Sequence, residues 1–262
     1  MRILFVGDIV GKAGRQAIEG LLERVIADRG IDFTVANAEN AAGGMGITPV
    51  IASEFLDLGI DVLTSGNHIW AKKEILSFLD EEERLLRPAN YPAGVPGRGA
   101  GIFQLGNGRK VGVLNLEGRV FMRNLECPFR TGEKEAEKLR EKTPIVLVDF
   151  HAEATSEKMA LAWFLNGRVS AVLGTHTHVQ TSDEKILSGG TGYITDVGMT
   201  GPLASVIGIR RQAALERFLT QIPWKFDVAT DEIELQGVIV EIEEENGKAR
   251  KIERVRVPLE GH

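Results

Sequence analysis

Cysteine is almost absent from this chain, which has Cys127 as its only one in 262 residues. A single thiol cannot form an internal disulfide, and it cannot supply the set of thiolates that a zinc finger needs. Chains without disulfides are typical of reducing compartments, so we expect a cytoplasmic protein. Cys127 has no histidine beside it in the sequence, and we do not expect it to act as a nucleophile.

Long apolar runs are also missing. The run that begins at Arg2 is interrupted by Asp8, far short of the roughly 20 residues that a membrane helix requires. The N-terminus also lacks the basic start, apolar stretch and small-residue cleavage site of a signal peptide. We therefore expect no membrane partner, and we expect the first residues to belong to the fold.

An excess of positive charge is the third absence. The net charge of -6 argues against a protein that wraps long nucleic acid, although local basic patches are not excluded. The composition, with 43% hydrophobic and 26% charged residues, is that of an ordinary globular protein. We expect a single domain over residues 1–262, and the sequence leaves open whether it forms a homo-oligomer.

Short β-rich apolar runs alternate with stretches of helical periodicity along the chain. Strands are expected at 2–7, 32–38, 60–66, 144–150, 169–174 and 191–196, and helices at 13–29, 49–58, 72–82, 132–142, 156–165 and 207–220. The alternation implies a mostly parallel sheet, and the later strands indicate a second one. Hairpins are expected at Asn107-Gly108 and Asn246-Gly247. The aperiodic stretch 117–131 is expected to be a surface loop or lid.

Five polar signatures each follow an apolar strand. They are GDIVG with Asp8, NAEN with Glu39 and Asn40, GNH with Asn67 and His68, DFHAE with His151, and GTHTH with His176 and His178. Because sites in α/β sheets form at the carboxyl ends of strands, we expect these five loops to meet. All histidines except His262 fall in these signatures, which a purely structural use of histidine does not explain.

The donors in these signatures are carboxylates, amide oxygens and imidazoles, which suit manganese, iron, zinc or cobalt. They are too many for one tetrahedral ion, so we infer two metal ions bridged by Glu39. Taken singly, each residue has a plainer interpretation, since a lone histidine or aspartate at a strand end is more often a turn or capping residue. Asn40 could almost equally form an Asx turn, whereas the adjoining His68 favours a ligand role for Asn67.

The order of the signatures resembles that of the calcineurin-type metallophosphoesterases. The motifs are similar to those of the bacterial YmdB-type cyclic-nucleotide phosphodiesterases, and the resemblance extends over nearly the whole chain. These motifs are GDIVGKAGR, NAENAAGGMGIT, SGNHIW, DFHAEATSEK and GTHTHVQT. The resemblance implies an α/β fold, a four-layer α/β/β/α sandwich of two mixed sheets flanked by helices. The chain departs from the general pattern at Val10, where a histidine is usual, and at Glu39, where an aspartate is usual.

The resemblance also implies a role for each site residue. One ion would be held by Asp8, Glu39, Asn40 and His178, with Asn40 replacing the missing histidine, and the other by Glu39, Asn67, His151 and His176. The ions would be divalent or trivalent, iron or manganese first and zinc or cobalt as alternatives, and a bridging hydroxide would attack phosphorus. His68 would protonate the departing oxygen as a general acid.

The implied activity is hydrolysis of cyclic nucleotides, of the 2',3' or the 3',5' type. Two alternatives stay open: the same metals could serve a phosphomonoesterase or an RNA nuclease, or the chain could be a regulatory binding protein with a structural metal site. Asp149 and Glu153 could orient imidazoles or be solvated charges. The stretch DVGMTGP, residues 196–202, could line the pocket.

Overall fold

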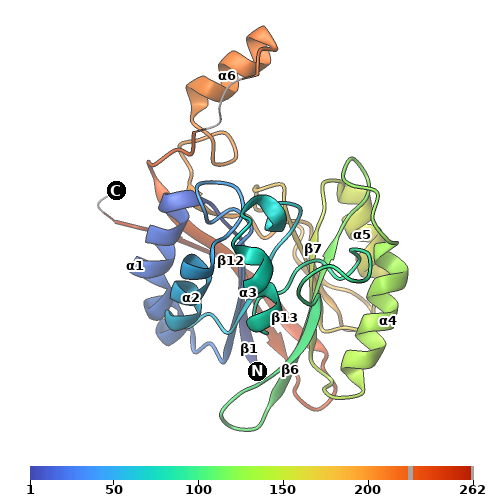
Figure 1. The fold of residues 1–262 in the computed structure, drawn as a ribbon. Coiled ribbons are helices and arrows are strands. Elements are labelled where there is room, and N and C mark those ends of the chain that lie inside the picture. The colour runs from blue at the N-terminus through green and yellow to red at the C-terminus, as the bar shows by residue number, and fades with distance from the viewer. Residues whose placement is uncertain (224–226, 261–262) are drawn as a thin grey trace.

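The structure is a computed structural model that describes residues 1–223 and 227–260. His262, which we set apart from the predicted site, lies outside the described residues. Two mixed β-sheets form the centre of the molecule, and helices lie on their outer faces (Figure 1).

The first sheet has the strand order β2 (Asp8–Ile9), β11 (Met199–Pro202), β12 (Ile233–Ile242), β1 (Arg2–Val6), β3 (Phe33–Asn37), β4 (Val62–Thr64), with β13 (Ala249–Pro258) paired to β12. β1, β3 and β4 run parallel to one another, and β12 runs antiparallel to β1. The carboxyl ends of the three parallel strands therefore lie at the same end of this sheet.

The second sheet has the order β5 (Ala100–Gln104), β6 (Lys110–Glu117), β7 (Val146–His151), β8 (Ala171–Thr175), β10 (Gly192–Ile194), β9 (Lys185–Ile186). β6, β7, β8 and β10 run parallel, while β5 and β9 are antiparallel at the two edges. The β5–β6 connection turns at Gly108, which has φ 83°, so the expected hairpin is confirmed.

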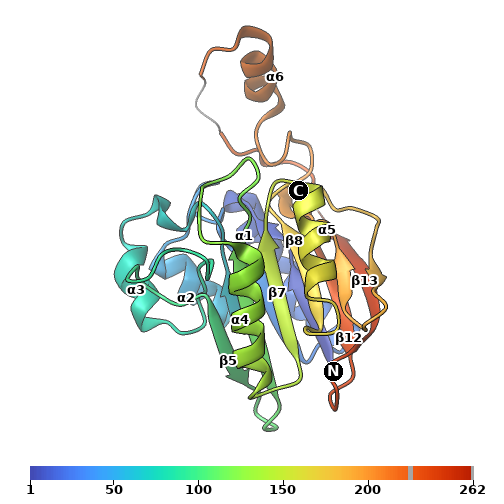
Figure 2. The same cartoon turned by 90° about the vertical axis from the view of Figure 1, so that its right-hand side faces the viewer.

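Helices cover the outer face of each sheet. α1 (Gly11–Arg29), α2 (Pro49–Asp57) and α3 (Ile75–Glu81) lie on the first sheet, and α4 (Pro128–Arg140) and α5 (Thr155–Phe164) lie on the second (Figure 2). The predicted four-layer α/β/β/α sandwich is confirmed.

Alternation along β1 shows how the layers are joined. Leu4 and Val6 belong to the core under α1, whereas Ile3 and Phe5 belong to the core between the two sheets. All four side chains are buried, because successive residues of a strand face opposite ways and both faces of this strand are covered.

Several element boundaries differ from those expected. The helix predicted at 132–142 begins at Pro128, since proline suits the first turn of a helix, and this shortens the expected loop. The helix predicted at 207–220, α6, begins only at Arg211, because Ile207 (φ 48°) and Gly208 (φ 98°) are not helical. No local pattern indicated β2, β9, β11 or the short 3-10 helix η1 (Ile69–Ala71).

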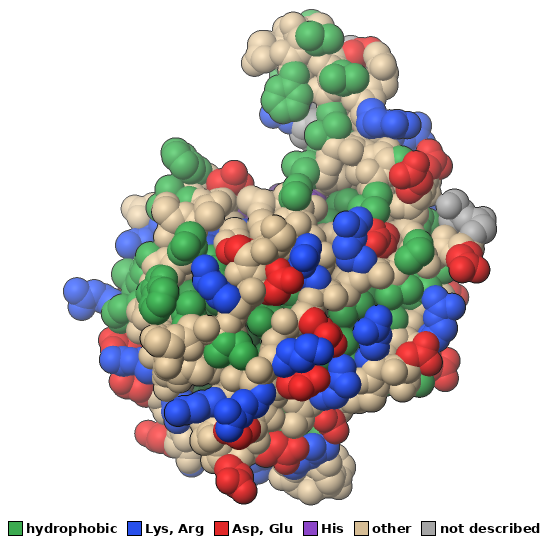
Figure 3. All heavy atoms as spheres, turned by 180° about the vertical axis from the view of Figure 1, so that it is seen from behind, with side chains coloured by type: hydrophobic (Ala, Val, Ile, Leu, Met, Phe, Trp, Pro, Cys, Tyr) green, Lys and Arg blue, Asp and Glu red, His purple; other side chains and the backbone are tan. Residues whose placement is uncertain are grey.

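α6 (Arg211–Thr220) projects from the body at the end of an arm that we define as residues 206–223 and 227–229. Figure 3 shows apolar side chains gathered on this projection, and Leu215, Phe218, Leu219 and Ile222 are all exposed. Within the described ranges, no helix combines the length and apolar character that crossing a bilayer requires.

Candidate metal centre

The five polar signatures meet where the parallel strands of the two sheets reach their carboxyl ends. The backbone N–H of His176, just after β8, donates to Asp8 Oδ2 at 3.0 Å, and the backbone N–H of His68, after β4, donates to Glu39 Oε2 at 3.1 Å. The structure thus brings all eight predicted site residues into one constellation, as the shared position at strand ends indicated.

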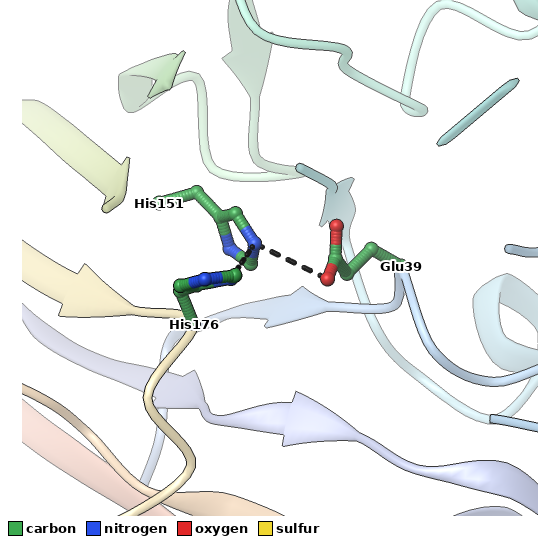
Figure 4. Close-up of side chains that lie close together, drawn as sticks. All are labelled: Glu39, His151 and His176. Atoms are coloured by element: carbon green, nitrogen blue, oxygen red, sulfur yellow. Dashed lines mark hydrogen bonds and ion pairs between the residues drawn. The ribbon is translucent and has the colours of Figure 1, made fainter. Parts of the chain in front are cut away.

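Glu39 is the centre of this constellation and is fully buried. Its Oε1 lies 3.1 Å from His151 Nε2 (Figure 4). The same oxygen accepts a hydrogen bond from Asn40 Nδ2 at 3.0 Å. Burial opposes ionisation of Glu39, but the nearby imidazoles of His151 and His68 outweigh it and hold the pKa well below the ordinary value. Glu39 is therefore a carboxylate.

His151, the last residue of β7, is held from behind. Thr175 donates its hydroxyl proton to Asp149 Oδ1 at 2.7 Å, so at 2.9 Å from His151 Nδ1 it must accept the proton of that nitrogen. The opposite nitrogen, Nε2, faces Glu39 and lies 3.2 Å from Asn67 Oδ1. Asp149 thus orients the imidazole through Thr175, and burial raises the pKa of Asp149 to about 6.

His176 also turns one ring nitrogen, Nδ1, toward His151 Nε2. Its Nε2 lies 3.2 Å from Glu153 Oε2, and its Nδ1 lies 3.0 Å from His151 Nε2. Burial, together with the neighbouring His151, lowers the pKa of His176 to about 3. The ring is therefore neutral, with Nε2–H donated outward to Glu153 and a bare Nδ1 turned inward.

His178 repeats the arrangement on the neighbouring side. Its Nδ1 donates to the backbone carbonyl of Ile207 at 2.9 Å, and its Nε2 lies 3.2 Å from Asn40 Nδ2. His176 and His178 both have positive φ, 96° and 62°, a conformation that costs energy in residues other than glycine. This strained turn lets two imidazoles one residue apart converge.

The donor set fits a metal. The inward nitrogens of His151 and His176, with a carboxylate oxygen of Glu39, lie within 4.8 Å of one another, and each outward nitrogen has an acceptor, the usual surrounding of metal-binding histidines. Burial disfavours the charged ring of His151, but Glu39 and Asp8 outweigh it and raise its pKa to about 9. The carboxylates thus favour a cation at this point.

Asp8 and Asn40 lie beside this trio. Asp8 is fully buried, and its Oδ1 has no hydrogen-bond partner among the described residues; it lies 3.8 Å from His178 Nε2. Burial raises the pKa of Asp8. An unpartnered buried carboxylate oxygen is costly unless it meets a cation, so this side of the site also fits a metal.

His68 occupies a different position, at the rim. Its side chain is 31% exposed, and its Nδ1 lies 2.8 Å from Asn40 Oδ1. Since an amide oxygen only accepts, Nδ1 carries the proton of this bond, which leaves Nε2 as the nitrogen able to exchange a proton with a ligand.

A cavity of about 390 Å³ opens over these residues. Its polar lining residues include Glu39, Asn40, His68, His176 and His178, which we call the polar side, and the described lining also includes Glu153 and several apolar residues. Of the stretch 196–202, Met199–Pro202 forms β11, and none of the stretch is among the described lining residues. The expectation that it lines the pocket is wrong for those residues.

Two features that hold the site in place were not predicted from the sequence. A Cβ on Gly66 would overlap His151 Cδ2 and Glu39 Oε2, so only glycine lets this loop pass behind the site. Beneath the histidine turn, buried Lys158 pairs with Asp196, whose Oδ2 accepts from the Thr177 backbone N–H at 3.1 Å. Lys158 lies in an ordinary helical pattern, and only the fold reveals its partner.

Comparison with known families and curated proteins gives consistent matches. The family described as "YmdB-like protein" matches residues 4–255. The 2',3'-cyclic-nucleotide 2'-phosphodiesterase of Bacillus subtilis is 46% identical over 257 residues, which cover 98% of this chain and 97% of that protein. A putative phosphatase/phosphodiesterase of Mycoplasma genitalium is 36% identical over 267 residues, 99% of this chain and 94% of that protein.

Solved structures agree in fold. The crystal structure of a hypothetical protein from Thermus thermophilus has a TM-score of 0.91 and 43% identity, covering 98% of this chain and 99% of that one. The crystal structure of a novel phosphatase from Mycoplasma pneumoniae has a TM-score of 0.92 and 32% identity, with coverage of 98% and 93%.

Proposed function

The chain belongs to the YmdB-like family, and from this we propose that it is a metal-dependent phosphodiesterase that hydrolyses cyclic nucleotides. The observation that carries the proposal is the convergence of inward imidazole nitrogens of His151 and His176 on the buried carboxylate of Glu39. The name of the Bacillus subtilis relative supports the substrate class and places its cleavage at the 2' ester.

Two ions with Glu39 as their shared ligand are the arrangement that we propose. Asp8, Asn40 and His178 would hold one ion with Glu39, and Asn67, His151 and His176 would hold the other. Asn40 Nδ2 and His151 Nε2 both lie close to Glu39 Oε1, at 3.0 and 3.1 Å. Oxygen and imidazole donors of this kind suit manganese or iron, with zinc or cobalt as alternatives. When bound, such ions supply positive charge to phosphoryl oxygens and acidify water.

The protein's own contribution to bond breaking is assigned to His68. Its Nδ1 is fixed by Asn40 Oδ1 at 2.8 Å, and its side chain lines the cavity. Nε2 would give its proton to the oxygen that leaves phosphorus, which would otherwise depart as a costly alkoxide.

The test is removal and return of metal. Protein treated with a chelator and verified as metal-free should lose hydrolysis of 2',3'-cyclic AMP, and added Mn²⁺ should restore it. The product should be the 3'-monophosphate, identified by chromatography. Undiminished turnover by the verified metal-free protein would refute the proposal.

A phosphomonoesterase is the second candidate, because the Mycoplasma relatives carry the word phosphatase in their names. The same preparation should therefore be assayed on nucleoside monophosphates. Faster release of phosphate from the monoester than hydrolysis of the cyclic diester would favour this candidate.

A further inference from the structure

The cavity has one side that the chemistry of phosphate hydrolysis does not use. We call it the apolar wall, and among the described residues it consists of Val10, Met45, Ile207, Ile209 and Val228. Its members line the same cavity as His68, His176 and His178. No member of the wall has a side-chain nitrogen or oxygen, so the wall cannot bind phosphate or metal.

The wall is brought close to the site by glycines. A Cβ on Gly44 would lie 2.6 Å from Val228 Cγ2, and one on Gly11 would lie 2.9 Å from Val228 Cγ1. Both glycines have positive φ, 90° and 58°. Val228 therefore packs against two backbone positions that accept no side chain, and this holds the base of the arm against the site loops.

Ile207 is the least expected member of the wall. It is β-branched and has φ 48°, where such residues are strained, yet its side chain remains 49% exposed at the cavity. Strain of this kind persists only where the surroundings enforce it, and it gathers at functional positions. Core packing does not account for a strained and half-exposed isoleucine.

The wall is also tied to the polar side. The carbonyl oxygen of Ile207 accepts the hydrogen bond from His178 Nδ1 at 2.9 Å. The position of the Ile207 backbone is thus fixed relative to an imidazole that we assign to metal. Met45, 49% exposed, lies among the described residues of the same cavity.

We propose that the apolar wall binds the nucleobase of the substrate while its phosphate lies on the polar side. This inference rests on the proposed function. A nucleotide is charged at one end and carries a flat, weakly polar ring at the other, which matches a cavity lined by both polar and apolar residues. Covering Met45 and Ile207 with the ring removes their apolar surface from water, which favours binding.

The experiment compares two cyclic esters that differ in the base. One is 2',3'-cyclic AMP, and the other is methyl ribofuranoside 2',3'-cyclic phosphate, which has a methoxy group in place of adenine. The variant is Ile207→Ala, which keeps the carbonyl bonded to His178. We divide kcat/KM for 2',3'-cyclic AMP by kcat/KM for the baseless ester. We expect this ratio to be about 10-fold lower in Ile207→Ala than in the wild type.

The matched control is Leu219→Ala on α6, which removes an apolar side chain that is 82% exposed and outside the described cavity lining. Its ratio should equal that of the wild type. Thermal unfolding supplies a second readout: because Ile207→Ala relieves strain, its Tm should stay constant or rise, whereas a purely structural side chain would lower the Tm on removal.

Equilibrium dialysis with adenosine, which has no phosphate, separates this inference from the proposed function. Weaker binding of adenosine by Ile207→Ala than by the wild type supports the wall as the base site even if neither ester is cleaved. An unchanged kcat/KM ratio together with unchanged adenosine binding overturns the inference and leaves the phosphodiesterase proposal standing.

Discussion

The buried ammonium of Lys158 lies 2.9 Å from Asp196 Oδ2, directly beneath the turn that carries two site histidines. Both partners also hold Thr177: Lys158 Nζ donates to Thr177 Oγ1 at 3.2 Å, and Asp196 accepts from the Thr177 backbone N–H. Since Thr177 stands between His176 and His178, this pair fixes the strained turn from below.

Lys158→Met should therefore destabilise the protein and impair the metal site together. The change leaves Asp196 charged and buried, which costs about 3 to 5 kcal/mol when a buried pair is broken. Denaturant unfolding measures the loss, and elemental analysis measures the bound metal. The control, Lys138→Met, removes an exposed lysine paired with Glu135 and should change stability by under about 1 kcal/mol. Equal effects of both variants would contradict this role for Lys158.

His68→Ala should separate metal binding from turnover. Because His68 is assigned no metal, elemental analysis should find wild-type metal content. Hydrolysis of 2',3'-cyclic AMP should fall by about two to four orders of magnitude, the contribution of a general acid. His151→Ala is the contrasting variant and should lose metal. Retained turnover in His68→Ala would remove His68 from the mechanism, and retained cellular function in an inactive variant would favour a regulatory role.

Gly66→Ala should damage the site through space alone. Gly66 does not have positive φ, so alanine fits the backbone, but its Cβ would overlap His151 and Glu39. We expect loss of metal and a destabilisation of about 1 to 3 kcal/mol. Gly106→Ala is the matched control, since a Cβ there would meet nothing within 4 Å. Full metal content in Gly66→Ala would show that His151 and Glu39 need not hold their positions.

Asp183 should contribute stability that disappears in acid. Burial opposes its ionisation, but hydrogen bonds from Thr195 and Thr181 outweigh burial and lower its pKa below 3.8. The stabilisation is therefore present above about pH 4 and is lost as pH falls through the folded-state pKa. Asp183→Asn should be less stable than the wild type at pH 7 and converge with it toward pH 2, as measured by Tm. Exposed Asp28→Asn serves as control, and a constant difference for Asp183→Asn across this range would oppose the assignment.

Base preference should follow ring size and not hydrogen-bonding groups. The apolar wall offers only hydrocarbon and thioether side chains, so 2',3'-cyclic AMP and GMP should have kcat/KM values within about three-fold. The smaller uracil ring covers less of Met45 and Ile207, so cyclic UMP should be the poorer substrate. Steady-state kinetics on the three esters measures this. A preference above 100-fold between the two purines would point to polar recognition of the base.

Much of the fold and the position of the site could be predicted because both depend on local patterns. Apolar runs and helical periodicity indicated β1, β3, β7 and α1, and the location of polar residues at strand ends indicated where they meet. Membership of the predicted family is likewise confirmed. The ligand roles and the single domain over residues 1–262 remain predictions. The sequence made no prediction on whether the chain forms a homo-oligomer.

The remainder depends on contacts between distant segments. Lys158 and Asp196 are 38 residues apart, and Ile207 meets His178 across 29 residues, so no local periodicity connects them. The positive φ of His176, His178 and Ile207 also runs against the preferences of these residue types, and only tertiary packing imposes it.

The site residues are spread along the chain, so the site can be completed only after most of the chain has been synthesised. Asp8 accepts the His176 backbone N–H across 168 residues, so a nascent chain that has not yet released its eighth strand carries five of the seven proposed ligands. His176 and His178 follow that strand. We therefore expect metal uptake to follow folding, and fragments that end before residue 176 should take up no more metal than an unfolded peptide.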